Sequence, residues 1–148
     1  MINWHRLFGI ALADFFRGSP YVVELEKDLS LKKQLLDVVI LRRTTEVWDR
    51  PLPDGFDNLA EHNLISYKSF REPFDDWTVE ELIAYYVNYR KQVSPALEDL
   101  LPKEMFRLFG ISTRFPQKLS LETKFTQVLK GVYEVKWGAT QIRLIVFK

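Results

Sequence analysis

The chain contains no cysteine and only two histidines among its 148 residues. Without cysteine it can form neither a disulfide bond nor a thiolate metal site, and this composition fits the reducing cytoplasm. Two histidines are too few for a metal site built from several imidazoles. We therefore expect a cytoplasmic protein without a cysteine-rich or histidine-rich metal centre.

The sequence also lacks a long hydrophobic run and an excess of either charge. No apolar stretch approaches the length of a membrane span, and the N-terminus lacks the pattern of a signal peptide, so we expect no membrane partner. Lys and Arg number 21 against 20 Asp and Glu, whereas a dedicated nucleic-acid binder is usually more basic. The 47% hydrophobic and 28% charged residues are typical of a globular protein, and the length fits a single domain, 1–148, with a real core.

The first third of the chain predicts one helix followed by two strands. Apolar residues recur at helical spacing over Trp4–Arg17, with Asn3 as the N-cap and Gly18-Ser19-Pro20 as the stop. Tyr21–Lys27 alternates as a strand does. Gln34–Arg43 predicts a second strand, antiparallel to the first because the connection is short.

Within that second strand, Asp37 interrupts an otherwise apolar run, QLLDVVIL. Apolar residues lie on both faces, which favours a central strand covered on both sides. A carboxylate in such a position must be paired, bind a metal, or lie at an open end of the strand. Asp37 is therefore a candidate functional residue, with these three alternatives open.

A third strand, Glu61–Phe70 (EHNLISYKSF), carries the second unusual charge, Lys68. Alternation puts Leu64, Ser66 and Lys68 on one face, and Asn63, Ile65 and Tyr67 on the other. Lysine is rarely buried without a partner. Two charged groups in two predicted core strands are the feature of this sequence most able to carry chemistry.

The remainder predicts a long polar loop, a strong helix, an irregular region and a terminal hairpin. The last strand ends the sequence, which fits either the edge strand of a domain or the N-terminal part of a longer chain. Together the elements predict an α/β fold with a mixed sheet flanked by helices. Their expected ranges are Thr44–Ala60 (loop), Trp77–Gln92 (helix, capped by Asp76 or Thr78), Ala96–Met105 (short helix or turns), Phe106–Ile111 (irregular or a short strand), Thr123–Lys130 (helix), and Val132–Lys136 with Gln141–Phe147 (hairpin).

The order of one helix, three strands, a helix and a strand resembles the core of the PD-(D/E)XK, or restriction-endonuclease-like, nuclease superfamily. QLLDVVIL resembles the second core strand of that family, whose aspartate binds the metal, here Asp37. HNLISYKSF resembles the third, whose (D/E)-X-K tripeptide is here Ser66-Tyr67-Lys68. More narrowly, this strand and the Trp- and Tyr-rich helix after it are similar to bacterial transposase-associated, Rpn-like nucleases. The resemblance covers Trp4–Gln92 and implies a restriction-endonuclease-like core.

The resemblance implies a Mg²⁺-dependent DNA nuclease with Asp37, Ser66 and Lys68 at the catalytic positions. In that chemistry carboxylates hold the ion, and the lysine orients or polarises the nucleophile. Serine stands at the acidic position of the motif, so either activity is lost and the chain is a degenerate relative, or another carboxylate replaces the missing one. Glu26 on the first predicted strand and Glu81 on the following helix are the candidate metal ligands besides Asp37.

A different class of function remains open beside the nuclease. Asp37 and Lys68 could form a structural ion pair inside a non-catalytic module that binds protein or nucleic acid. In either case, five cations could flank a nucleic-acid groove, although such residues more often lie on a solvated surface. These cations are Arg42, Arg43, Arg71, Arg90 and Lys91.

Overall fold

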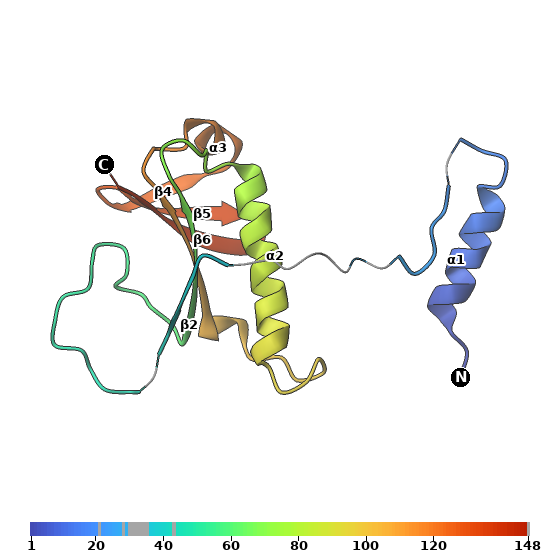
Figure 1. The fold of residues 1–148 in the computed structure, drawn as a ribbon, viewed down its shortest axis with the longest axis horizontal. Helices are drawn as coiled ribbons and strands as arrows, with labels where there is room; N and C mark the ends of the chain where they lie inside the picture. Colours follow the sequence, from blue (N-terminus) through green and yellow to red (C-terminus); the bar gives the residue numbers. More distant parts are fainter. Residues whose placement is uncertain (21, 28, 30–35, 43, 148) are drawn as a thin grey trace. The chain divides into compact units, whose positions relative to one another are not determined.

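The computed structural model of the chain forms two compact units, Met1–Gln34 and Leu35–Lys148. It describes residues 1–20, 22–27, 29, 36–42 and 44–147. The first unit holds one helix and the second holds the sheet (Figure 1).

The first unit is built on helix α1, Trp4–Phe15. The predicted helix and its cap are confirmed, because the side chain of Asn3 accepts a hydrogen bond from the Arg6 amide at 3.0 Å. The predicted strand over 21–27 is wrong for its described part, residues 22–27, which form no strand. Glu26 adopts a φ of +51°, and an extended strand cannot continue through that left-handed conformation.

The second unit is a six-stranded mixed sheet in the order β1-β2-β3-β6-β5-β4. This confirms the α/β class with a mixed sheet and helices. The strands are β1 (Val38–Leu41), β2 (His62–Lys68), β3 (Phe106–Ser112), β4 (Phe125–Leu129), β5 (Val132–Trp137) and β6 (Thr140–Val146).

Strand β1 lies at one edge of the sheet and pairs antiparallel with β2. The sequence predicted a central strand there, and this expectation is wrong: Val38 and Leu41 are exposed. Described residues 44–60 form the predicted loop without helix or strand, and β2 confirms the predicted third strand. Part of the predicted second strand, residues 34, 35 and 43, lies outside the described residues.

Three neighbouring strands, β2, β3 and β6, run parallel to one another. The register aligns Lys68 with Ser112 and Ser112 with Val146. The carboxyl ends of the three strands therefore meet at one edge of the sheet. Strand β3 was expected to be irregular or short, but it is a seven-residue central strand.

Helix α2, Asp76–Val93, packs on β2 and confirms the predicted helix. Its N-cap is Asp75 rather than Asp76 or Thr78: the Asp75 carboxylate accepts the Thr78 amide at 3.0 Å. Ser94 ends the helix as expected.

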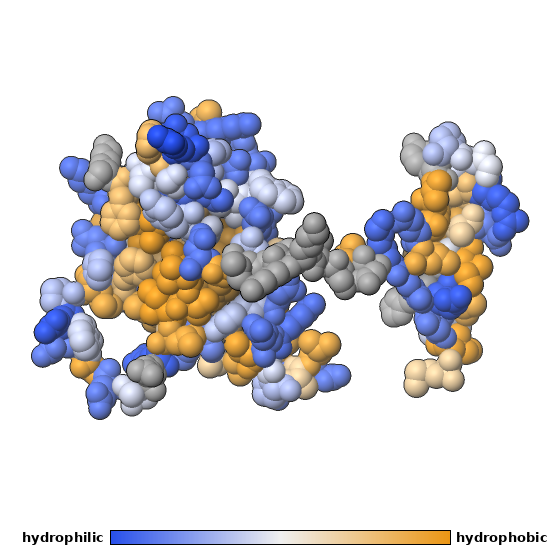
Figure 2. Space-filling view, in the orientation of Figure 1, coloured by the Kyte–Doolittle hydropathy of each residue, from blue (hydrophilic) through white to orange (hydrophobic). Residues whose placement is uncertain are grey.

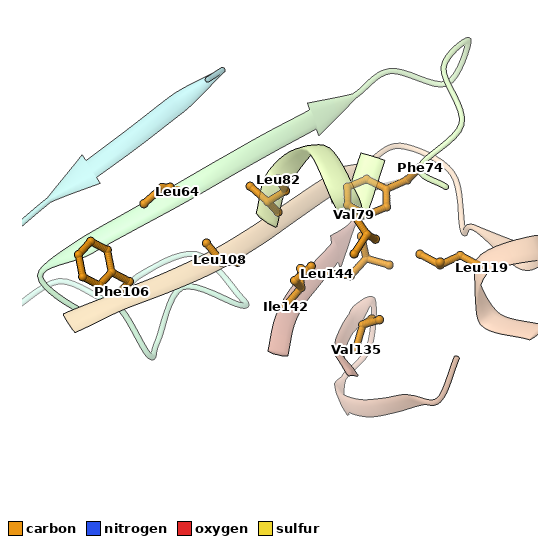
Figure 3. Packing of buried hydrophobic residues seen from close by; sticks show 10 residues of the cluster. All are labelled: Leu64, Phe74, Val79, Leu82, Phe106, Leu108, Leu119, Val135, Ile142 and Leu144. Carbon is orange, nitrogen blue, oxygen red and sulfur yellow. The ribbon is translucent and has the colours of Figure 1, made fainter. Parts of the chain in front are cut away.

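Figure 3 shows the larger apolar cluster, in which α2 and the segment before it pack on one face of the sheet. Leu82 and Val79 of α2 lie against Leu64, Leu108 and Leu144 of the sheet. A smaller cluster covers the other face, where Phe56 of the 44–60 loop packs against Phe109 with ring centroids 5.2 Å apart and the rings tilted by 33°. The two clusters confirm the predicted alternation of β2, with Leu64 on one face and Ile65 on the other.

The C-terminal third contains the predicted hairpin, β5 and β6, and one wrong prediction. Residues 123–130 were expected to be helical, but they contain strand β4, which pairs antiparallel with β5. Helix α3 (Gln117–Glu122) and the 3₁₀ turn η1 (Lys103–Met105) complete the unit. Phe125 of β4 packs against Phe115 and Tyr133, so tertiary packing outweighs the local helical pattern.

Within the described part of the chain, no helix is both long and apolar enough to cross a membrane.

Figure 2 shows a broad apolar area on the sheet unit between the 44–60 loop and α2.

Candidate functional site

Asp37 directly precedes β1, and its side chain is exposed. One carboxylate oxygen accepts a hydrogen bond from the backbone amide of Tyr67 at 2.8 Å. This contact connects Asp37 to the Ser66-Tyr67-Lys68 tripeptide, 30 residues further along the chain. Asp37 thus lies at an open end of the strand, which is one of the three alternatives that the sequence left for it.

Lys68 is the last residue of β2, on the face covered by α2. Its ammonium group lies 3.8 Å from the carboxylate of Glu72, and the Lys68 side chain is 23% exposed. The ion pair that the sequence suggested between Asp37 and Lys68 is not among the ion pairs of the described residues. A contact of this length at a solvent-exposed carboxylate is weak, so the Lys68 ammonium remains available for another anion.

Ser66, two residues before Lys68 on β2, is buried. It is aligned with Gly110 of the neighbouring strand. The ring of Phe74 lies where a Cβ of residue 110 would stand, so glycine is needed for this close packing. Phe74 thus forms an apolar wall beside Ser66.

Glu81 and Tyr85 lie one turn apart on α2, and the Tyr85 hydroxyl donates a hydrogen bond to Glu81 at 3.3 Å. Burial raises the pKa of Tyr85, and the negative charges of Glu81 and Asp37 raise it further. Of these two carboxylates, Glu81 is the one that contacts the Tyr85 hydroxyl. Glu81 belongs to α2, and Asp37 directly precedes β1.

Asp75 adds a further carboxylate near Lys68. Burial acts to raise the pKa of this carboxyl, but hydrogen bonds from Thr78 and the charge of Lys68 outweigh it, so the pKa lies below its ordinary value of 3.8. Asp75 is consequently a carboxylate anion, and hydrogen bonds from Thr78 fix it at the N-terminus of α2.

Glu26, the other candidate metal ligand, belongs to the first unit. There its carboxylate lies 3.6 Å from the guanidinium of Arg6. Glu26 was expected on a first strand beside the second, but the described residues 22–27 contain no strand. No group of three or more His, Cys, Asp or Glu side chains in the described ranges is arranged to hold a metal.

A second polar cluster lies away from these residues, centred on Arg143 of β6. Its guanidinium contacts Glu134 at 2.6 Å, Asp57 at 2.7 Å and the carbonyl of Gly55 at 3.3 Å. Arg143 also lines a cavity of about 270 Å³ with Lys103 and Arg107. None of Asp37, Ser66, Lys68 and Glu81 lines that cavity.

Sequence reasoning overlooked Arg143, although the signal was present. Arg143 interrupts the apolar run QIRLIVF in the same way that Asp37 interrupts QLLDVVIL. It also overlooked Glu72 and Asp75, which follow Lys68 in a short loop. For Asp75 the signal was a cap residue three positions before Thr78.

No protein-family model, curated protein or solved structure matches this chain.

Proposed function

We propose that this protein is a PD-(D/E)XK-like nuclease with a reduced site, which hydrolyses DNA phosphodiester bonds with Mg²⁺. The observation that best supports it is the hydrogen bond of 2.8 Å from the Tyr67 amide to the Asp37 carboxylate, which joins this aspartate to the Ser66-Tyr67-Lys68 tripeptide. The order β1, β2, α2 and β3 agrees with the later part of the core expected from the sequence.

The available donors fit Mg²⁺ better than other common metals. Mg²⁺ needs only one or two carboxylates, because water and substrate phosphate oxygens complete its shell. Asp37 and Glu81 are the residues that would hold it. Glu81 would replace the acid of the motif, because Ser66 stands at the acidic position. When bound, the ion would lower the pKa of a coordinated water molecule and stabilise the negative charge on the phosphate.

Lys68 and Asp37 have separate roles in this proposal. In hydrolysis a water oxygen bonds to phosphorus, the bond from phosphorus to the leaving sugar oxygen breaks, and that oxygen takes up a proton. The Lys68 ammonium stabilises the developing charge on a phosphate oxygen, because its contact with Glu72 is long enough to be exchanged. Asp37 is held in position by the Tyr67 amide.

The test is cleavage of mixed single- and double-stranded DNA with Mg²⁺ or Mn²⁺. Asp37→Ala, Glu81→Gln and Lys68→Met should each reduce the rate about a hundred-fold or more. Glu80→Gln is the matched control, because Glu80 is an exposed neighbour on α2. Ser66→Glu should increase the rate by restoring a carboxylate to the motif. Cleavage that survives Asp37→Ala, or no cleavage by either the native chain or Ser66→Glu, would contradict the proposal.

The second candidate function is a non-catalytic interaction module on the same fold. The observation that favours it is Ser66, which offers a neutral hydroxyl at the position where the resemblance calls for an acid. This second candidate function predicts that a calorimetric titration detects no divalent-cation binding and that Ser66→Glu does not change cleavage. Metal binding that depends on Asp37 would exclude it.

A further inference from the structure

The carboxyl edge of the parallel strands carries both cations and exposed aromatic rings. Lys68 ends β2, and the chain continues directly into Phe70 and Arg71. Phe147 follows β6 at the same edge, where its amide donates to the Ser112 carbonyl at 2.9 Å. Adjacent strands lie about 4.8 Å apart, so the ends of β2 and β6 are roughly 10 Å apart across β3. Ligands of open α/β sheets commonly bind outside the carboxyl ends of their strands.

The rings at this edge are more exposed than aromatic side chains in a core. Phe70 is 62% exposed and Phe147 49% exposed. The Arg71 guanidinium lies over the Phe70 ring, 5.8 Å from its centroid. Trp77, in the first turn of α2, is also exposed. Arginine and phenylalanine arranged in this way offer flat surfaces on which an unpaired base can stack.

The charge at the edge is too balanced to bind a duplex through its phosphates. Lys68, Arg71 and Arg114 supply three cations, but Glu72 lies beside Lys68. The first amides of α2, a common phosphate site, are instead occupied by its own carboxylates: Asp75 accepts the Thr78 amide and Asp76 the Trp77 amide. Duplex binding depends mainly on phosphate neutralisation, whereas single-strand binding gains much of its affinity from stacking.

We propose that the carboxyl edge of β2, β3 and β6 binds unpaired DNA, with Phe70 and Phe147 stacking on bases while Arg71 and Arg114 contact the backbone. This inference rests on the proposed function, since it names the substrate form that the Asp37 and Lys68 site would act on. The substrate is a single strand, or a duplex end with unpaired nucleotides, that reaches Lys68 along this edge.

The test measures binding by fluorescence anisotropy in EDTA, so that cleavage does not contribute. The probes are a labelled 20-nucleotide oligo-dT and a labelled blunt 20-base-pair duplex. The native chain should bind the single strand at least about ten-fold more tightly, and Phe70→Ala and Phe147→Ala should each weaken that binding about ten-fold. Phe15→Ala is the matched control, because Phe15 is an exposed phenylalanine of α1 and its loss should change nothing.

The outcomes separate this inference from the proposed function. Equal affinity for the two probes, no binding, or full affinity in both phenylalanine variants would overturn the inference that this edge binds unpaired bases. This holds even if Mg²⁺-dependent duplex cleavage were observed. Single-strand binding that requires Phe70 and Phe147 would support it, even if no condition gave cleavage. An oligo-U probe bound as tightly as oligo-dT would support stacking on unpaired bases but would overturn the restriction to DNA.

Discussion

Lys68 and Arg143 are both cations in core strands of the sheet, yet their surroundings differ sharply. The Arg143 side chain is 10% exposed and has contacts of 2.6 Å and 2.7 Å to two carboxylates. The Lys68 side chain is 23% exposed, and its ion pair with Glu72 measures 3.8 Å. Arg143 joins the 44–60 loop to the sheet, whereas Lys68 stands at a strand end beside exposed residues.

The difference separates a structural charge from a candidate functional one. A buried cation whose hydrogen bonds are all made inside the protein contributes to the architecture. A cation with one long contact retains the capacity to bind a ligand. The sequence signal, a charge inside an apolar strand, is the same for both residues, so only the partners distinguish their roles.

The largest expected effect comes from removing Arg143, the cation that is paired with two carboxylates. Arg143→Ala leaves the mostly buried Glu134 carboxylate and Asp57 without their partner, and it should lower the free energy of unfolding by about 3–5 kcal/mol. Urea denaturation followed by circular dichroism measures this. The double variant Arg143→Met with Glu134→Leu should recover much of the loss, because it leaves no unpaired carboxylate in the sheet. A loss below 1 kcal/mol for Arg143→Ala would contradict the structural role.

At the Lys68 end we expect the helix cap to contribute more stability than the lysine. Asp75→Ala should cost about 1 kcal/mol. The folded pKa of Asp75 lies below its ordinary value of 3.8, so its charge stabilises the fold above that pH and ceases to do so as the pH falls through the folded value. The difference between the native chain and Asp75→Asn, which keeps the cap but not the charge, should therefore vanish in acid. Urea denaturation at several pH values measures this, and a difference that grows in acid would contradict it.

The smallest expected effect on stability belongs to Lys68. Lys68→Met keeps most of the aliphatic side chain and loses only a long ion pair, so the free energy of unfolding should change by less than about 1 kcal/mol. The same urea assay, run beside Arg143→Ala, compares the two cations directly. A loss as large as that of Arg143→Ala would show that Lys68 is structural as well.

Much of the sheet unit could be predicted because its strongest patterns are local. The alternation of β2, helix α2 and the terminal hairpin are each determined by neighbouring residues. Strand β4 and the central position of β3 could not be predicted, because pairing with distant strands decides them. Glu26 shows a related limit, since its left-handed conformation interrupts a pattern that alternates like a strand.

For the site, the sequence identified the residue types but not their contacts. Asp37, Ser66 and Lys68 were recognisable from their strand patterns, yet the bond from the Tyr67 amide to Asp37 depends on the register of β1 against β2. That register cannot be derived from either strand alone. The choice of Glu81 over Glu26 likewise depends on how α2 packs on β2.

The most direct test of the central claim is Mn²⁺-induced relaxation in NMR spectra at neutral pH. If Asp37 and Glu81 hold one divalent ion, Mn²⁺ should broaden the ring signals of Tyr85 and the amide signal of Tyr67. The broadening should be lost in Asp37→Asn and in Glu81→Gln, and it should persist in the control Glu80→Gln. Unchanged broadening in both carboxylate variants, or no effect on Tyr85 in the native chain, would contradict a shared metal site.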